Sequence, residues 1–221
     1  MIPALLCLIA VASYLLGCLN AVSITSRLLF RRRLRPKTGD RAVTAMNRVF
    51  GVPGVAAVIV FDAAKTVVAV LLAGLLLQVV GREPLESTIS YAAVGRLFSA
   101  FCVLLGHCFP VFYRFRGGKG GVVALAALMC VHFPLGVLSA LICAGLVAAT
   151  RYLSLGVIAG TVIAPLGVWL EKGGLCALLS LFCVLMILFK YSPNILRLIR
   201  RTEPKIDFRQ DLSMKFEQED F

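Results

Sequence analysis

The chain has 221 residues and a formal net charge of +12; 60% of its residues are hydrophobic and only 15% are charged. So large an apolar share excludes a soluble globular domain and predicts a polytopic integral membrane protein. Nucleic acid is a poor candidate partner, because the 23 lysines and arginines lie in short loops between apolar runs.

Three long apolar segments occupy the first half of the chain. Residues 3–29 have neither a leading basic region nor a following cleavage site, so we expect a retained helix rather than a removed signal. Residues 49–80 exceed the length that a hydrocarbon core of ~30 Å requires, so this helix tilts or begins in the interface. The third segment covers residues 91–113.

Four predicted helices occupy the second half. Residues 122–149 contain no Lys, Arg, Asp or Glu, and His132-Phe133-Pro134 interrupts them, which predicts a hairpin of two short helices. One unbroken helix there would instead give five or six spans and an outer C-terminus. Helices over about 155–170 and 175–189 complete an all-α fold of about seven transmembrane helices.

The distribution of charge predicts the orientation. If the N-terminus lies outside, the inner segments are 27–48, 114–119, 150–154 and 190–221, which hold 8, 3, 1 and 7 lysines and arginines, or 19 of the 23. This asymmetry is what the positive-inside rule requires. We therefore expect a cytoplasmic C-terminus, one membrane domain over residues 1–206 and a cytoplasmic tail over residues 207–221.

The eight cysteines lie within apolar runs and form no Cys-x-x-Cys pair. Small buried hydrophobic residues are therefore a better interpretation than metal ligands or disulfides. Because no cluster of carboxylates or of His and Cys side chains is evident, we expect neither a metal nor a cofactor.

A glycine-rich turn follows the third apolar segment. Gly117, Gly118 and Gly120 surround Lys119, and the next helix is predicted to begin at about Gly121. Bare glycine amides and a helix N-terminus favour an anion, which predicts a phosphate cradle at a membrane face. The alternative is a cytoplasmic loop whose cations only fix the topology. It is not a Walker loop, because Lys119 is followed by Gly120 rather than by Ser or Thr.

Further polar side chains lie at helix ends that the alternating topology brings to the same face. They are Thr38, Gly39, Asp40, Thr44, Asn47, Arg48, Arg151, Ser154, Tyr191 and Asn194. Hydroxyls, amides and fixed cations together suit a phosphate monoester or an acyl phosphate. No pair of carboxylates is available at this face for acid–base catalysis.

Two features within the membrane admit two interpretations each. Asp62 and Lys65, at i and i+3, form either an ion pair that locks helices together or a direct contact to substrate. His107, one turn before the glycine-rich turn, either binds phosphate or ties the turn to a neighbouring helix. His132, beside Pro134 at the opposite face, is interpreted as a turn residue.

These residues resemble the bacterial acyl-phosphate:glycerol-3-phosphate acyltransferases of the PlsY type. The specific match to the second motif of that family is Gly106-His107-x-Phe109-Pro110-x-Phe112 followed by Phe115-x-Gly117-Gly118-Lys119-Gly120. Supporting matches are Asp62-x-x-Lys65, Arg151-Tyr152-x-Ser154-Leu155, and Asn194-Ile195-x-Arg197-Leu198 with Thr202-Glu203 beyond. The similarity covers about residues 10–206.

The first motif departs from the family pattern. The family usually has Ser-Gly-Asn-x-Gly-Ala-x-Asn-x-x-Arg, and residues 38–48 keep the hydroxyl at Thr38 together with Gly39 and Arg48. Asp40, Ala42 and Ala45 replace Asn, Gly and Asn, and Tyr191 stands where the family commonly has His. These changes bear on substrate choice and rate but not on the fold.

The resemblance implies a monomeric multi-pass enzyme of the bacterial cytoplasmic (inner) membrane, with its active site on the cytoplasmic side. It would move a fatty acyl group from acyl phosphate to glycerol-3-phosphate, giving lysophosphatidate and phosphate for phospholipid synthesis. The implied catalytic residues are Thr38, Arg48, Lys119, Ser154 and Asn194. The implied substrate-binding residues are Gly39, His107, Gly117, Gly118, Gly120, Arg151 and Tyr191.

Two alternatives remain open at this point. One is a relative that has lost catalysis through the altered first motif and keeps only a lipid-binding role. The other is a transporter of an anionic metabolite, although no internal repeat of the kind common in transporters is present.

Overall fold

The computed structural model describes residues 2–31, 42–81 and 90–205, and within these ranges the chain is helical and contains no strand. The helices are α1 (Ile2–Gly17), α2 (Ala21–Leu28), α3 (Ala42–Gly81), α4 (Tyr91–Cys108), α5 (Gly121–Val131), α6 (Phe133–Thr150), α7 (Leu153–Val162), α8 (Ala164–Lys172) and α9 (Gly174–Ile199), with a 3₁₀ turn, η1 (Val111–Tyr113), after α4. The all-α prediction is confirmed. The predicted tail over 207–221 lies outside the described residues.

The described helices supply enough apolar length for a polytopic membrane protein. Five segments are long and apolar enough to cross a bilayer: Val49–Gly81, Tyr91–Tyr113, Phe133–Thr150, Leu153–Lys172 and Gly174–Ile199. The bent pair α1 and α2 brings the number to six if it is one span. The apolar α5, with 11 residues, is the short helix that brings the sequence-based number to seven.

The first predicted segment is in fact two helices that meet at 57°. Asn20 takes up extended backbone and caps α2, since its Oδ1 accepts a hydrogen bond from the Ser23 N–H at 3.1 Å. A capping asparagine of this kind favours the start of a new helix over continuation of the old one. The single helix predicted over 3–29 was therefore wrong.

The hairpin predicted over 122–149 is confirmed. The α5 helix ends at Val131, and His132 caps α6 by accepting the Leu135 N–H at Nδ1 over 3.3 Å. His132 Nε2 also lies 3.7 Å from an oxygen of Glu171 on α8. His132 is a turn residue, as the sequence indicates.

Two other helix boundaries differ from the sequence-based ones. The helix predicted over 155–170 begins earlier and is interrupted at Ile163, just before Pro165, to give α7 and α8. The last helix continues ten residues beyond the predicted Phe189, because α9 runs through Pro193 to Ile199. This extension places Tyr191 and Asn194 within α9 rather than beyond its end.

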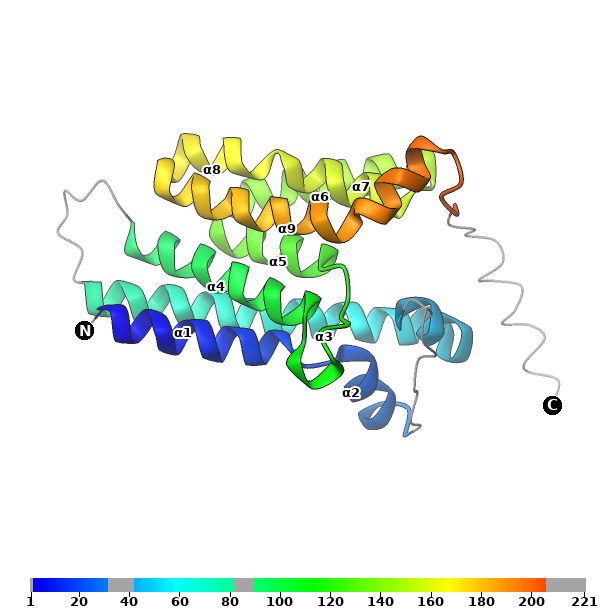
Figure 1. The fold of residues 1–221 in the computed structure, drawn as a ribbon, viewed down its shortest axis with the longest axis horizontal. Coiled ribbons are helices and arrows are strands. Elements are labelled where there is room, and N and C mark those ends of the chain that lie inside the picture. The colour runs from blue at the N-terminus through cyan, green and yellow to red at the C-terminus, as the bar shows by residue number, and fades with distance from the viewer. Residues whose placement is uncertain (1, 32–41, 82–89, 206–221) are drawn as a thin grey trace.

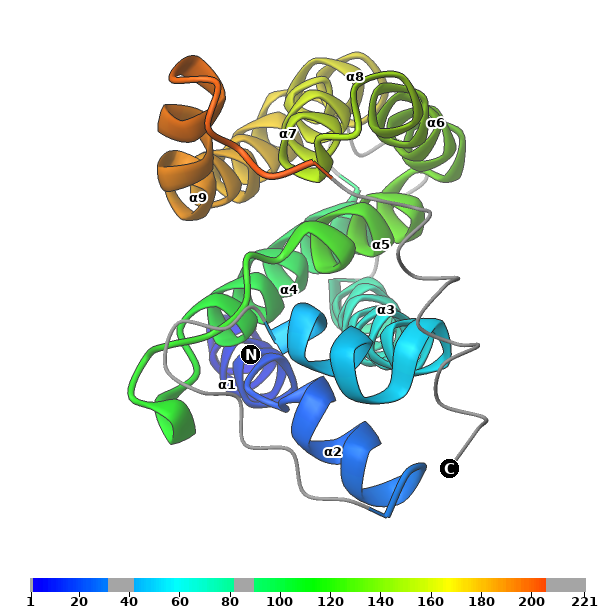
Figure 2. The ribbon, with the colours of Figure 1, turned by 90° about the vertical axis from the view of Figure 1, so that its right-hand side faces the viewer.

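The helices form two groups on either side of a layer made of α4 and α5. Figure 2, which looks along the bundle, shows α1, α2 and α3 on one side of this layer and α6 to α9 on the other. The α4 helix joins the groups, since it contacts α1, α3, α5 and α9. In Figure 1 the start of α3, the start of α7 and the end of α9 lie toward the right-hand end of the bundle, and the loop after α4 lies nearer the middle of the view, on the side of α4 that faces this end.

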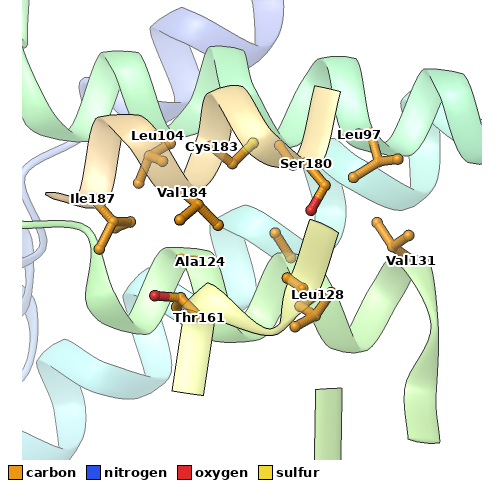
Figure 3. A pocket seen from close by; sticks show the side chains of 13 residues that line it. Leu97, Leu104, Ala124, Leu128, Val131, Thr161, Ser180, Cys183, Val184 and Ile187 are labelled. Atoms are coloured by element: carbon orange, nitrogen blue, oxygen red, sulfur yellow. The ribbon is translucent and has the colours of Figure 1, made fainter. Parts of the chain in front are cut away.

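A narrow apolar seam runs between the two groups (Figure 3). Its cavity of about 30 Å³ is lined by Leu97, Ala100, Leu104, Ala124, Ala127, Leu128, Val131, Thr161, Ala164, Ser180, Cys183, Val184 and Ile187. Two lining side chains, Leu104 and Ile187, adjoin the position that a Cβ of Gly120 would take. The seam therefore begins beside the glycine-rich turn and continues into the apolar interior.

Glycines permit a close crossing of α1 and α4. A Cβ on Gly17 would collide with the Val103 carbonyl oxygen, and a Cβ on Gly106 would collide with the Tyr14 carbonyl oxygen. Small residues at such crossings let helix backbones approach in membranes, where association depends on packing. Beside this crossing, the Ser13 and Ser99 hydroxyls share a hydrogen bond of 2.8 Å.

Replacing Gly106 with alanine tests this crossing. We expect Gly106→Ala to lower the melting temperature in detergent, with a loss of about 1–3 kcal/mol in the free energy of unfolding, because the added methyl group overpacks the interface. Gly145→Ala is the matched control, since a Cβ there meets no heavy atom within 4 Å and alanine favours a helix. A melting temperature for Gly106→Ala as high as that of the control would contradict the described crossing.

Candidate functional site

The glycine-rich turn reverses the chain between α4 and α5. After Pro110 and η1, Arg114 and Phe115 adopt left-handed backbone with φ of 52° and 59°, and the chain then returns toward α4. Gly120 has φ of 79° and precedes α5, which begins at Gly121 as predicted. Glycine adopts this backbone without the strain that a Cβ would add.

Lys119 lies at the centre of a cluster that joins three helix ends. Its Nζ donates a hydrogen bond of 2.6 Å to Oδ1 of Asn194, and the same ammonium lies 5.2 Å from the ring centroid of Tyr191. Tyr191 and Asn194 are both buried near the end of α9. The tyrosine at the position where the resembled family commonly has histidine therefore contributes a cation–π contact to Lys119.

A buried carboxylate connects Asn194 to Ser154. Oε1 of Glu203 accepts hydrogen bonds from Asn194 Nδ2 at 2.5 Å and from Ser154 Oγ at 3.0 Å. Asn194 is 1% exposed, Ser154 is 2% exposed and Glu203 is 7% exposed. Since the amide nitrogen of Asn194 faces Glu203, its oxygen is turned toward Lys119. One carboxylate thus sets the direction of the amide that holds the lysine.

The sequence interpretation missed Glu203 as a site residue. It counted Glu203 only within the basic inner segment 190–221, whereas the chain turns back after α9: Arg201 takes φ of 56° and the Thr202 N–H donates to the Arg197 carbonyl oxygen at 2.8 Å. The available signal was the family match Thr202-Glu203 beyond Asn194. The carboxylate is also 3.9 Å from Nε of Arg197, which places a second cation beside it.

Four predicted site residues therefore meet in one place: Lys119, Ser154, Tyr191 and Asn194. They come from the turn before α5, from the start of α7 and from α9. An ammonium, a hydroxyl and an amide at the end of a membrane bundle are groups that bind a phosphate oxyanion. The arrangement supplies charge and hydrogen-bond donors but, among the described residues at this end, no pair of carboxylates for acid–base exchange.

His107 belongs to a different cluster. Its Nδ1 lies 3.3 Å from Nζ of Lys65 and 3.5 Å from Oδ1 of Asp62, and the two α3 side chains are 2.7 Å apart. The Asp62–Lys65 pair is thus an ion pair that locks helices together, which was one of the two interpretations of the sequence. Gly117 and Gly118 pack against His107, since a Cβ on either would collide with it.

The other predicted site residues are not joined to the Lys119 cluster by described contacts. Thr38 and Gly39, with Asp40 of the altered motif, lie outside the described residues. Arg48 lies on the first turns of α3 at the same end of the bundle (Figure 1), and its side chain is outside the described part of the chain. Arg151 is exposed at the left-handed C-cap of α6. Gly120 faces the seam rather than the cluster.

Comparisons with known proteins agree on one family. A family model described as glycerol-3-phosphate acyltransferase matches residues 7–201. A protein of Dinoroseobacter shibae named glycerol-3-phosphate acyltransferase is 32% identical over 205 residues, which cover 92% of this chain and 94% of that protein. A protein of the same name from Legionella pneumophila (strain Corby) is 33% identical over 211 residues, which cover 95% of this chain and 72% of that protein.

Solved structures support the architecture. Crystal structures of PlsY, described as an integral membrane glycerol 3-phosphate acyltransferase, exist in a glycerol 3-phosphate form and a lysophosphatidic acid form. They match this chain with TM-scores of 0.75 and 0.74 at 24% and 23% identity, over 94% of this chain and 98% of theirs. At this identity the likeness establishes the fold.

Glu203 provides the test of the cluster. We expect Glu203→Ala to lower the free energy of unfolding by about 1–3 kcal/mol, because it leaves the buried donors of Ser154 and Asn194 without their acceptor. Glu203→Gln keeps an accepting oxygen and is expected to lose less. Glu171→Gln is the control, since that side chain is 54% exposed. Thermal unfolding in detergent measures all three, and a Glu203→Ala protein as stable as wild type would rule out the described bonds.

Proposed function

The chain belongs to the glycerol-3-phosphate acyltransferase family, and we propose that its acyl donor is an acyl phosphate. It is a membrane enzyme that acylates glycerol-3-phosphate. In the proposed reaction the 1-hydroxyl of glycerol-3-phosphate attacks the acyl carbon, the bond from that carbon to the phosphate oxygen breaks, and lysophosphatidate and inorganic phosphate leave. The observation that carries the proposal is the meeting of Lys119, Ser154 and Asn194 at one end of an apolar bundle.

Lys119 has the central role in this proposal. Its ammonium lies in a partly buried position, where a fixed charge stabilises a phosphate more strongly than in water. The Asn194 amide binds it directly, and the Ser154 hydroxyl is connected to that amide through Glu203. We assign Lys119 to the phosphate of the acyl donor, with Thr38 and Arg48 of the first motif as further phosphate ligands. Ser154 has a single hydroxyl hydrogen, which binds Glu203 in the described structure and turns to the phosphate when the acyl donor binds. Asn194 stays bound to Glu203 and holds Lys119.

Glycerol-3-phosphate is assigned to the glycine-rich turn. Exposed Gly117 and half-buried Gly118 present backbone amides without a Cβ that would keep an anion away. Arg151 and Tyr191 border the same end of the bundle, and Gly39 of the first motif is assigned to the same substrate. The two substrates then lie side by side, which converts their encounter into a positioned reaction.

The proposed chemistry needs no carboxylate base. An acyl phosphate is already activated, because the phosphate is a good leaving group, so the protein positions two anions and neutralises their charge. The hydroxyl proton passes to an oxygen of the departing phosphate. Glu203 is engaged by Ser154 and Asn194 and acts in this account by orienting them.

The same proposal includes location and assembly. The positive-inside distribution of charge supports a Lys119 end at the cytoplasmic face of the bacterial inner membrane. We also assign a monomeric enzyme, because the three helix ends of the Lys119 cluster reach one another within a single chain.

An assay of the purified protein with acyl phosphate and glycerol-3-phosphate tests the function. We expect lysophosphatidate from wild type and a loss of about 10²–10³-fold in kcat/KM for Lys119→Met, because a charge aimed at the reacting phosphate is removed. Lys172→Met is the matched control: Lys172 ends α8, at the opposite end of the bundle from the turn (Figure 1).

The results separate the competing functions. Wild-type rates for Lys119→Met would refute the assignment of the site. Saturable binding of both substrates without product, under conditions in which a known family member turns over, would indicate a relative without catalysis. Movement of intact glycerol-3-phosphate into liposomes that contain the protein would indicate a transporter.

A further inference from the structure

A second polar cluster lies deeper in the bundle, between α3, α4 and the break that separates α1 from α2. It consists of Asp62, Lys65 and His107, and the side chains of Asp62 and Lys65 are 9% and 4% exposed. Lys65 Nζ is 2.7 Å from Asp62 Oδ1 and donates to the carbonyl oxygen of Leu19 at 2.8 Å. Buried charges at membrane depth require such partners.

The break between α1 and α2 explains why a lysine is suited to this place. A helix end leaves carbonyl groups without helical partners, and Lys65 reaches two of them, Leu19 at 2.8 Å and Gly17 at 3.3 Å. The ammonium also lies between the carboxylate of Asp62 and Nδ1 of His107. The Lys65 ammonium therefore contacts acceptors on α1, α3 and α4 and in the break after α1.

The contact between Lys65 and His107 determines where the imidazole carries its proton. A lysine ammonium has three N–H donors and no acceptor, and four acceptors lie within 3.3 Å of Lys65 Nζ: Asp62 Oδ1, the Leu19 and Gly17 carbonyl oxygens and His107 Nδ1. Nδ1 lies 3.3 Å from Lys65 with hydrogen-bond geometry and 3.5 Å from Asp62 Oδ1, so we take Nδ1 as the acceptor of Lys65. Asp62 and Lys65 already neutralise each other, and a protonated imidazole would add an uncompensated buried charge. A neutral ring with Nδ1 accepting carries its hydrogen on Nε2.

The protonated nitrogen faces the glycine-rich turn. The position that a Cβ of Gly118 would occupy collides with Nε2 of His107, and the Gly118 N–H donates to the His107 carbonyl oxygen at 3.0 Å. The ring and the backbone of one residue thus hold Gly118 from two sides. Lys119 is the next residue, and its ammonium belongs to the proposed phosphate site.

We propose that the Asp62–Lys65 pair fixes His107 as the neutral Nε2–H tautomer and that His107 is thereby the positioning residue for the turn that carries Lys119. Its action is indirect: the ion pair orients the ring, the Nε2 edge of the ring packs against Gly118, and the turn places Lys119. The kinetic part of this inference rests on the proposed function, whereas the assignment of the tautomer does not.

Nitrogen NMR of ¹⁵N-histidine-labelled protein tests the tautomer directly. The chain has two histidines, and His132→Asn isolates His107, since asparagine is also a good N-cap. We expect a pyridine-like signal for Nδ1 and a protonated, pyrrole-like signal for Nε2 at neutral pH. In Lys65→Met we expect the proton to move to Nδ1, where Asp62 accepts it. A proton on Nδ1 in the parent protein would overturn the inference, whether or not Lys65→Met folds.

Two substitutions of His107 test its positioning role. Glutamine places an amide donor near the position of Nε2, whereas asparagine reaches only the position of Nδ1. We therefore expect His107→Asn to raise KM for glycerol-3-phosphate about tenfold or more, and His107→Gln to restore most of that loss, at equal melting temperatures. Equal KM values for the two variants would overturn the role. Absence of activity in wild type would count against the proposed function, and the NMR result would still decide the tautomer.

Discussion

Glu203 is the constraint on which the described site depends. One oxygen of its carboxylate, Oε1, accepts hydrogen bonds from Ser154 on α7 and from Asn194 on α9. The side-chain oxygen of Asn194 in turn accepts a hydrogen bond from Lys119, which precedes α5. Three helix ends are thus connected by one short chain of hydrogen bonds in a buried setting, where each bond is stronger than it would be in water. The Lys119 ammonium, the Asn194 amide and the Ser154 hydroxyl owe their directions to Glu203, a residue outside the helices.

The rest of the bundle keeps its polar groups at defined places. Backbone groups are satisfied within helices, as lipid requires, and the break between α1 and α2 has its freed carbonyl groups bound by Lys65. Close approach of α1 to α4 at Gly17 and Gly106 brings this break next to His107. A series of contacts therefore runs from the break after α1 through the Asp62–Lys65 pair and His107 to the glycine-rich turn, and from Lys119 in that turn to α9.

Much of this could be predicted from the sequence, because apolar length and the positions of glycine and proline are local signals. They identified the all-α membrane fold, the hairpin at His132 and the start of α5 at Gly121. The break at Asn20 was missed because a capping asparagine in an apolar run carries little signal. Glu203 was missed because its role arises from a reversal of the chain after Arg201, and no periodicity reports such a return. The roles of Thr38, Gly39 and Arg48 stay predictions.

The most direct test of the account is an experimental structure of this protein with glycerol-3-phosphate and a non-hydrolysable acyl phosphate analogue bound in lipid. The account predicts the phosphate of the analogue within hydrogen-bond distance of Lys119 Nζ and Ser154 Oγ, with the Asn194 amide still held by Glu203. Both ligands bound at the other end of the bundle, near His132 and Glu171, would contradict it.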